Sequence, residues 1–199
     1  MSASTHEADL AAGQRIGPGR LVLVVGPSGA GKDTLIAHAR AACSSDSGIV
    51  FPRRAVTRTV SGAEDHDSLS DDAFDRAVTD GSFAFHWQAH GLKYGIWRTV
   101  EDDLRGGRTV VCNVSRTVVA GLRQRYARVD AVLITAPAEV LAARLAGRAR
   151  ASDGALTQRL QRNAAFETFR ADHVIDNIGA TEIAARHLLA VIRPIAAGA

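Results

Sequence analysis

The sequence has few cysteines and no long apolar segment. Only Cys43 and Cys112 occur among its 199 residues. They are too few and too far apart for a disulfide framework or a zinc site, so we expect two buried, reduced thiols. The chain has no run of 18 apolar residues, and its first twenty residues lack the apolar centre of a secretory signal. We therefore expect a cytoplasmic protein without a membrane partner.

Lysine and aromatic residues are also scarce. Lys32 and Lys93 are the only lysines, against 22 arginines, and the formal net charge is +3. Aromatic residues make up 5% of the chain, too few to interleave with basic side chains as in proteins that bind single strands. A weak positive excess suits phosphorylated small molecules, and we expect no nucleic-acid partner. The oligomeric state stays open.

The length and the 46% hydrophobic content fit a single domain. Residues 1–19 have no periodicity and predict a disordered leader, whereas residues 20–199 predict one domain. Short apolar runs and helical patterns alternate along that domain. The runs lie at 21–25, 109–112, 131–135 and 173–176, and the helical patterns at 32–42, 118–125, 138–148, 155–170 and 181–192. This alternation predicts an α/β fold in which helices flank a parallel sheet.

Between about residues 52 and 98 the alternation is interrupted. The segment is charged, rich in histidine and rich in turn residues, and it contains one predicted short helix, with Ser70 as its N-cap and its end at Asp80. We interpret the segment as an insertion that carries substrate contacts.

The segment GPSGAGKD at Gly26–Asp33 matches the phosphate-loop pattern GxxxxGK, and it stands between a predicted strand and a predicted helix. Its glycines allow backbone N–H groups to converge on a polyphosphate, and the helix that follows adds its positive end. Lys32 supplies a mobile charge. The predicted nucleotide site consists of Gly26, Pro27, Ser28, Gly29, Ala30, Gly31, Lys32, Asp33 and Thr34.

One residue of this motif is unusual. Asp33 stands where the general pattern has Ser or Thr, and Thr34 follows one place later. A carboxylate can bind Mg²⁺ directly or through water, but without a metal it would repel phosphates. Asp33 is therefore the candidate metal ligand, while a contact from Thr34 to Mg²⁺ or to phosphate stays open.

Several motifs together resemble the guanylate kinase superfamily over about residues 20–195. They are GPSGAGKDT, Thr57-Arg58, GSFAFHWQAHGLKYG and two arginines eleven residues apart, Arg148 and Arg159. The resemblance implies a P-loop NTPase fold of the nucleotide-monophosphate kinase type, ATP as the donor and Lys32 as a catalytic residue. It also implies a helical lid, at about 144–163, that closes Arg148 and Arg159 over the transferring phosphoryl group.

The residues that read guanine in that superfamily are not matched. Phe85 stands where a glutamate belongs, and Ile96 replaces a hydroxyl residue. A pocket without these groups leaves polar atoms of guanine unpaired, at a cost of about 1–3 kcal/mol for each. A guanylate kinase is therefore the alternative. A non-catalytic interaction module of the same superfamily is a weaker one, because it has no need of Lys32, Arg148 and Arg159 together.

A second set of residues more closely resembles the ribose 1,5-bisphosphate phosphokinase family. The set comprises Glu64 with His66, Leu69-Ser70, Trp87, Gly91, Tyr94-Gly95 and Asn113 followed by Ser115-Arg116. The resemblance implies phosphorylation of ribose 1,5-bisphosphate by ATP, which gives 5-phosphoribosyl 1-diphosphate (PRPP) and ADP. It further implies a place in phosphonate degradation and in PRPP and NAD biosynthesis.

Such an acceptor needs cations for two phosphates and polar groups for its ribose hydroxyls. The predicted substrate-binding residues are Arg54, Arg58, Glu64, His66, Tyr94, Asn113 and Arg116. Further candidates are Arg53, Asp67, His90 and Lys93. We expect Trp87 to pack in the core, and we expect Asp71, Asp72 and Asp75 to form a solvated helix face.

Overall fold

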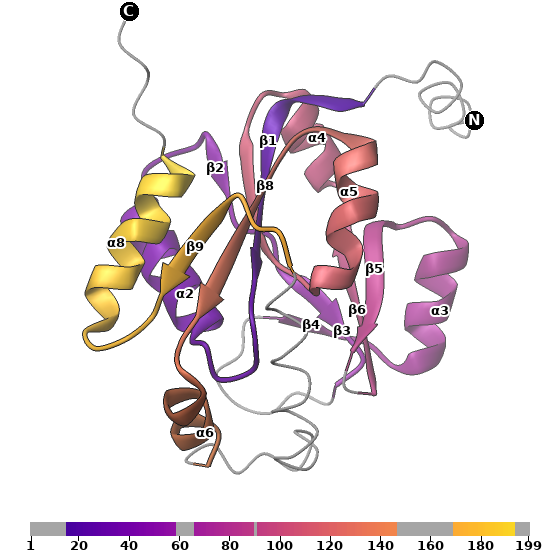
Figure 1. The fold of residues 1–199 in the computed structure, drawn as a ribbon. Coiled ribbons are helices and arrows are strands. Elements are labelled where there is room, and N and C mark those ends of the chain that lie inside the picture. The colour runs from indigo at the N-terminus through magenta and orange to yellow at the C-terminus, as the bar shows by residue number, and fades with distance from the viewer. Residues whose placement is uncertain (1–14, 59–65, 90, 147–168, 194–199) are drawn as a thin grey trace, which may run out of the picture.

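The computed structural model describes residues 15–58, 66–89, 91–146 and 169–193. Its centre is a five-stranded sheet with the order β2-β7-β1-β8-β9 (Figure 1). The strands are β1 (Ile16–Val25), β2 (Ile49–Val50), β7 (Thr109–Asn113), β8 (Tyr126–Thr135) and β9 (His173–Asp176). Every neighbouring pair runs parallel, so the carboxyl ends of the strands share one edge. The predicted parallel α/β sheet is confirmed.

Side chains of β1 alternate between two cores. Leu21 and Leu23 point into one apolar cluster and Val22 and Val24 into the other, and all four are fully buried. A strand that is buried on both faces has no polar side, which explains its uninterrupted apolar run.

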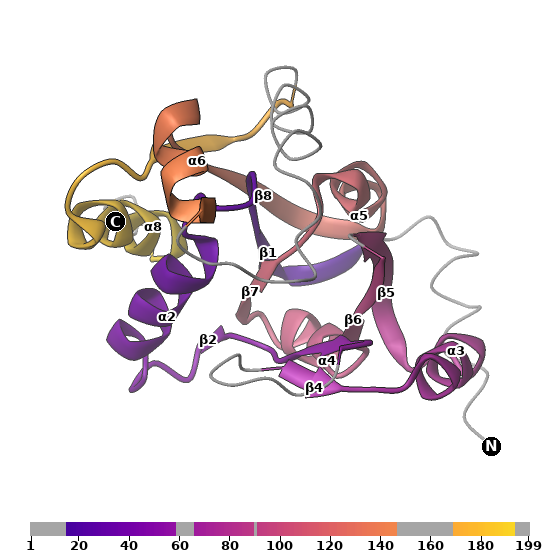
Figure 2. The same ribbon diagram turned by 90° about the horizontal axis from the view of Figure 1, so that it is seen from below.

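Helices cover both faces of this sheet (Figure 2). The pair α2 (Lys32–Ala42) and α8 (Thr181–Ile192) lies on one face. The helices α4 (Val100–Arg105) and α5 (Val119–Arg125) lie on the other. Two further elements, the 3₁₀ turn η1 (Arg116–Val118) and α6 (Ala138–Ala146), follow the carboxyl ends of β7 and β8.

The insertion forms a second sheet that the sequence did not predict. Its order is β4-β3-β6-β5, with β3 (Arg54–Val56), β4 (His66–Ser68), β5 (Phe83–Ala89) and β6 (Leu92–Trp97). The helix α3 (Asp71–Thr79) covers the outer face, where the rings of Phe74 and Phe83 lie 4.8 Å apart. The predicted N-cap is confirmed, since Ser70 Oγ accepts a hydrogen bond of 3.2 Å from Ala73 N.

Some predicted boundaries are wrong. The first strand begins at Ile16, so residues 16–19 belong to the fold and not to a disordered leader. A Cβ at Gly17 or Gly19 would collide with Ala127 or with the carbonyl of Arg108. These glycines therefore serve close packing of the strand. Residues 1–14 lie outside the described residues, as do positions 155–168 of one predicted helix, and 169–170 are not helical.

Arg20 connects the beginning of the fold to its end. Its guanidinium pairs with Asp130 at 2.9 Å and donates to the carbonyl oxygens of Val191 and Ile192 at 2.7 and 2.6 Å. A positive charge at the carboxyl end of α8 interacts favourably with the helix dipole and satisfies two terminal carbonyls.

Both cysteines are buried and neither forms a disulfide, as predicted. Burial raises the pKa of Cys112 to about 12 and also raises the pKa of Cys43. No helix in the described part of the chain is long and apolar enough to cross a membrane.

Candidate active site

The phosphate loop joins the carboxyl end of β1 to the start of α2. Gly26, Gly29 and Gly31 adopt φ angles of 152°, 85° and 86°, which residues other than glycine rarely adopt. A Cβ at Gly26 would collide with the carbonyl of Ile134, and one at Gly31 with the side chain of Asn177. The glycines of the motif are thus required both by the backbone angles and by the neighbouring strands.

Lys32 lies over this loop. Its Nζ donates to the carbonyl oxygens of Gly26 and Pro27 at 2.8 and 2.9 Å, so its charge is held at the loop. Gly31 occupies the N-cap of α2 without a side-chain cap, which leaves N–H groups of the first turn available to an anion. This arrangement can bind phosphate.

Asp33 connects the loop to two other elements. Its Oδ1 accepts 2.7 Å from Asn113 Nδ2, at the end of β7, and 3.4 Å from Arg54 Nη2, at the start of β3. Just over half of the Asp33 side chain, 58%, is exposed. The predicted metal ligand and two of the predicted substrate residues therefore meet at one point, between the first sheet and the second.

The inner face of the second sheet continues from this point. Arg54 is in register with His66 on β4 and with Ile96 on β6, so the three side chains share a face. His66 is 7% exposed, and Tyr94 stacks on Trp87 at 5.4 Å between ring centroids. The predicted residues Arg54, His66 and Tyr94 thus come together, and Trp87 packs in the core as expected.

Other candidates occupy the outer side of this sheet. Asp67 accepts a hydrogen bond from Trp97 Nε1 at 2.9 Å and pairs with Arg53 Nε at 3.1 Å. Lys93 pairs with Asp75 at 2.7 Å and with Asp71 at 3.3 Å. The hydrogen bond to Asp75 raises the pKa of Lys93. The contacts seen for Arg53, Asp67 and Lys93 are structural, and these residues do not join the inner face.

The acidic face of α3 has a further role besides solvation. The side chains of Asp71 and Asp75 are exposed, as expected, but they also bind Lys93 and so hold α3 against β6.

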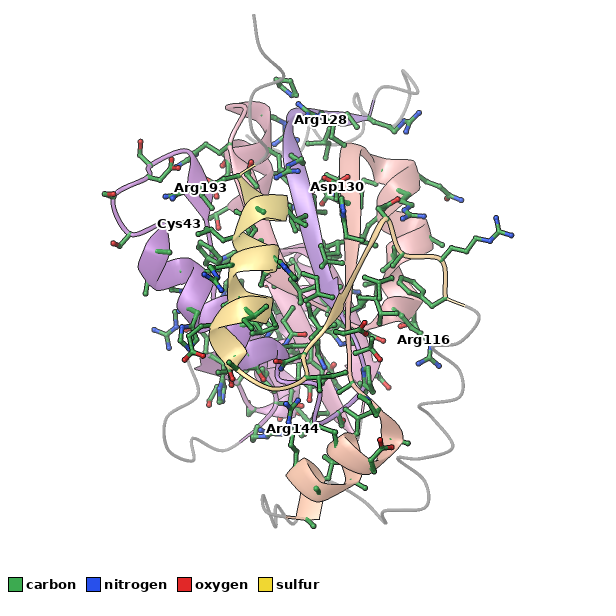
Figure 3. The ribbon with its side chains drawn as sticks, turned by 60° about the vertical axis from the view of Figure 1, so that its left-hand side comes forward. Cys43, Arg116, Arg128, Asp130, Arg144 and Arg193 are labelled. Carbon is green, nitrogen blue, oxygen red and sulfur yellow. The ribbon has the colours of Figure 1, made fainter. Side chains whose placement is uncertain are left out.

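Two more predicted arginines lie on the loops around this site. Arg116 opens η1, three residues after the end of β7, and Arg58 lies two residues after the end of β3. Figure 3 places Arg116 and Arg144 toward the carboxyl ends of the strands, whereas Arg128 and Asp130 lie toward the opposite end. Ligands of parallel sheets collect at the carboxyl edge. The remaining candidates, Glu64, His90, Arg148 and Arg159, lie outside the described residues.

Two residues next to the loop were missed by the sequence analysis. Asn177 Nδ2 donates to Ala30 O at 2.8 Å, and Arg144 Nη2 donates to Asn177 O at 2.9 Å. Asn177 is 147 positions away from its partner in the chain, so no local motif could have identified it.

Comparison with known proteins identifies the family. No family model matches the chain. It is 56% identical over 178 residues to ribose 1,5-bisphosphate phosphokinase PhnN of Bradyrhizobium diazoefficiens, covering 89% of this chain and 90% of that protein. The chain belongs to the ribose 1,5-bisphosphate phosphokinase family. The same-named protein of Rhodopseudomonas palustris is 58% identical over 178 residues, again covering 89% of this chain and 90% of the relative.

Among solved structures, a guanylate kinase from Anaplasma phagocytophilum has the same fold. The TM-score is 0.64, with 20% identity over 89% of this chain and 88% of that one. The P-loop fold of the nucleotide-monophosphate kinase type is thereby confirmed, and membership of a phosphokinase family makes this protein a kinase.

Proposed function

We propose that the protein transfers the γ-phosphoryl group of ATP to the 1-phosphate of ribose 1,5-bisphosphate, which gives PRPP and ADP. An acceptor phosphate oxygen forms the new bond to phosphorus, and the bond to the leaving ADP oxygen breaks. The 56–58% identity to two proteins of that name, over nine-tenths of each, is the observation that carries the proposal. The reaction would serve phosphonate degradation and the supply of PRPP for NAD biosynthesis.

The donor side relies on the phosphate loop. Lys32 and the N–H groups at the start of α2 would bind the β- and γ-phosphates, because they present positive charge at the end of the loop. Asp33 suits Mg²⁺, since Mg²⁺ in such sites takes one or two carboxylates together with phosphate oxygens and water. Its exposed carboxylate stands beside the loop, with Thr34 adjacent. When bound, Mg²⁺ supplies charge neutralisation to the phosphates.

The acceptor side relies on the inner face of the second sheet. Arg54, Arg58 and Arg116 would bind the two acceptor phosphates, as guanidinium groups pair well with phosphate oxygens. The polar groups assigned to the ribose hydroxyls are those of Glu64, His66, Tyr94 and Asn113. A phosphate oxyanion is already a nucleophile, so catalysis consists of positioning and charge neutralisation and requires no general base.

Arg148 and Arg159 complete the proposed catalytic set. The resemblance to guanylate kinases assigns them to the lid, where they would neutralise the transferring phosphoryl group.

The position of Phe85 and Ile96 supports this acceptor over GMP. Both side chains are buried, at 8% and 0% exposure, in the apolar cluster that contains Leu21 and Leu23. The resemblance to guanylate kinases places them where a carboxylate and a hydroxyl would read guanine. A site that leaves polar edges of a base unpaired should lose about 10⁴-fold in kcat/KM.

The test is coupled ADP release with purified enzyme and three acceptors: ribose 1,5-bisphosphate, GMP and gluconate. We expect kcat/KM for ribose 1,5-bisphosphate to exceed that for GMP by about 10⁴-fold or more. Turnover of GMP at least equal to that of ribose 1,5-bisphosphate would refute the proposal and favour a guanylate kinase. Equal or better turnover of gluconate would refute the phosphate acceptor.

A further inference from the structure

Asn177 is fixed at the carboxyl edge of the first sheet by three hydrogen bonds. It follows β9 directly and is 3% exposed. Its backbone N–H donates to Thr135 O at 2.8 Å, and its carbonyl accepts from Arg144 Nη2 at 2.9 Å. Because both main-chain groups are hydrogen-bonded, the position from which the side chain extends is fixed.

The third hydrogen bond reaches the phosphate loop. Asn177 Nδ2 donates to Ala30 O at 2.8 Å, within the loop that precedes Lys32. In a trans peptide the C=O and the following N–H point in opposite directions. Holding the carbonyl of Ala30 toward the buried amide therefore turns the N–H of Gly31 away from Asn177.

Arg144 strengthens the same contact from α6. Its Nη1 lies 3.5 Å from Gly29 O while its Nη2 holds Asn177 O, so one guanidinium links the loop to the residue that orients it. The absent Cβ of Gly31 completes the fit, because the amide of Asn177 fills the space that a side chain there would need.

The other end of the amide shows what the residue is for. Asn177 Oδ1 is buried and has no hydrogen-bond partner among the described residues. A buried acceptor without a partner destabilises a fold, so Oδ1 gives no reason for an amide at this position. The hydrogen bond from Nδ2 to Ala30 O accounts for an amide at this position.

We propose that Asn177 is a positioning residue for the donor phosphates: its amide fixes the Ala30–Gly31 peptide so that the Gly31 N–H faces the phosphates of ATP. This inference rests on the proposed function for the identity of the donor. It assigns to Asn177 an effect on nucleotide phosphates and none on the acceptor.

Two variants test the inference. Asn177→Asp keeps the shape but replaces the donor with an oxygen, and Asn177→Ala removes the amide. Asp176→Asn, a change at an exposed neighbour, is the matched control. We expect both Asn177 variants to raise the ADP dissociation constant in calorimetry and the KM for ATP by at least about tenfold. The acceptor KM should change less than about twofold, whereas a general loss of structure would not separate the two substrates.

The pH dependence of ADP binding gives a second readout. A protonated carboxyl can donate to Ala30 O, so lowering the pH from 8 to 5 should restore ADP affinity to Asn177→Asp relative to Asn177→Ala. Unchanged ADP affinity in both variants would overturn the inference. Failure of Asn177→Ala to fold would overturn it too, because it would show that the amide has a structural role. The ADP arm needs no acceptor, so it stays decisive even if wild-type protein binds ADP but ignores ribose 1,5-bisphosphate, a result that refutes only the proposed function.

Discussion

The two sheets present their predicted ligand-binding groups in different ways. On the first sheet the predicted phosphate contacts belong to one continuous loop, Gly26–Asp33, whose shape is set by backbone angles and by its close approach to Ile134 and Asn177. On the second sheet the predicted acceptor contacts are side chains from separate short strands, such as Arg54, His66 and Tyr94. A backbone loop recognises phosphate in general, whereas in an assembly of side chains each residue can be substituted separately. We therefore expect substitutions in the second sheet to change which acceptor the protein prefers.

The largest test of this contrast uses the two lysines. Lys32→Ala should lower kcat by about 100-fold or more, because the charge at the loop is needed as negative charge develops in the transition state. Lys93→Ala is the matched control, since that lysine binds α3, and its kcat should stay within about twofold of wild type. Steady-state kinetics with ATP as donor measures both. Comparable losses of kcat in the two variants would show that the lysine of the loop is no more important for catalysis than the lysine of the second sheet.

The next largest effect concerns glycines. Gly26→Ala places a Cβ against the carbonyl of Ile134 at φ 152°, and we expect a loss of about 2 kcal/mol or more in the free energy of unfolding. Gly91→Ala, in the turn between β5 and β6, meets no atom within 4 Å and should lose only the cost of a positive φ, about 1 kcal/mol. Urea denaturation compares them. If Gly91→Ala loses more free energy of unfolding than Gly26→Ala, the phosphate loop does not depend on its backbone conformation more than the second sheet does.

Neighbouring arginines sharpen the comparison within the second sheet. Arg54 lies on the inner face beside Asp33, and Arg53 pairs with Asp67. Arg54→Ala should raise the acceptor KM by about tenfold and leave the KM for ATP within about twofold, because a lost charged hydrogen bond is worth about 1.5–3 kcal/mol. Arg53→Ala should leave the acceptor KM near its wild-type value. If Arg53 has the larger effect, the inner face is not where the acceptor binds.

The smallest expected effect is a pH dependence of stability. The Cys112 thiol is buried against the first sheet. Burial raises its pKa from 9.0 to about 12, and the nearby charge of Arg54 has a smaller, opposite effect. A raised pKa adds stability that is complete below pH 9 and is lost as the pH rises toward 12. Unfolding free energies at pH 8 and 10 should differ by about 1 kcal/mol more in wild type than in Cys112→Val. Equal differences would show that the thiol is not desolvated.

Much of the first sheet could be predicted from the sequence. The helix at 181–192 and the strand at 173–176 have the predicted limits, because their apolar patterns are long enough or bounded by turn residues. The phosphate loop is a local motif and needs no tertiary information. The start of β1 was missed because Gly17, Pro18 and Gly19 are typical of loops, although here they allow close packing.

The second sheet could not be predicted in the same way. The strands β3 and β4 have three residues each, which is too short for an alternating pattern to stand out. Lys93 illustrates the consequence, since a lysine near a substrate segment suggests a phosphate contact, but the register of β6 turns it outward toward Asp75. Asn177 and Arg144 depend on contacts across the whole chain and leave no local signal.

The hydrogen bonds from Arg20 to the end of α8 have a practical consequence for rearranging the chain. They bring Arg20 and Ile192 together, and β1 begins and α8 ends at the edge remote from the phosphate loop (Figure 1). A short linker between these two ends would run along that remote edge and would not cover the edge that carries the phosphate loop. New ends could then be cut in the exposed turn at 44–48 that follows α2. Such a circular permutant should keep both sheets and bind ADP.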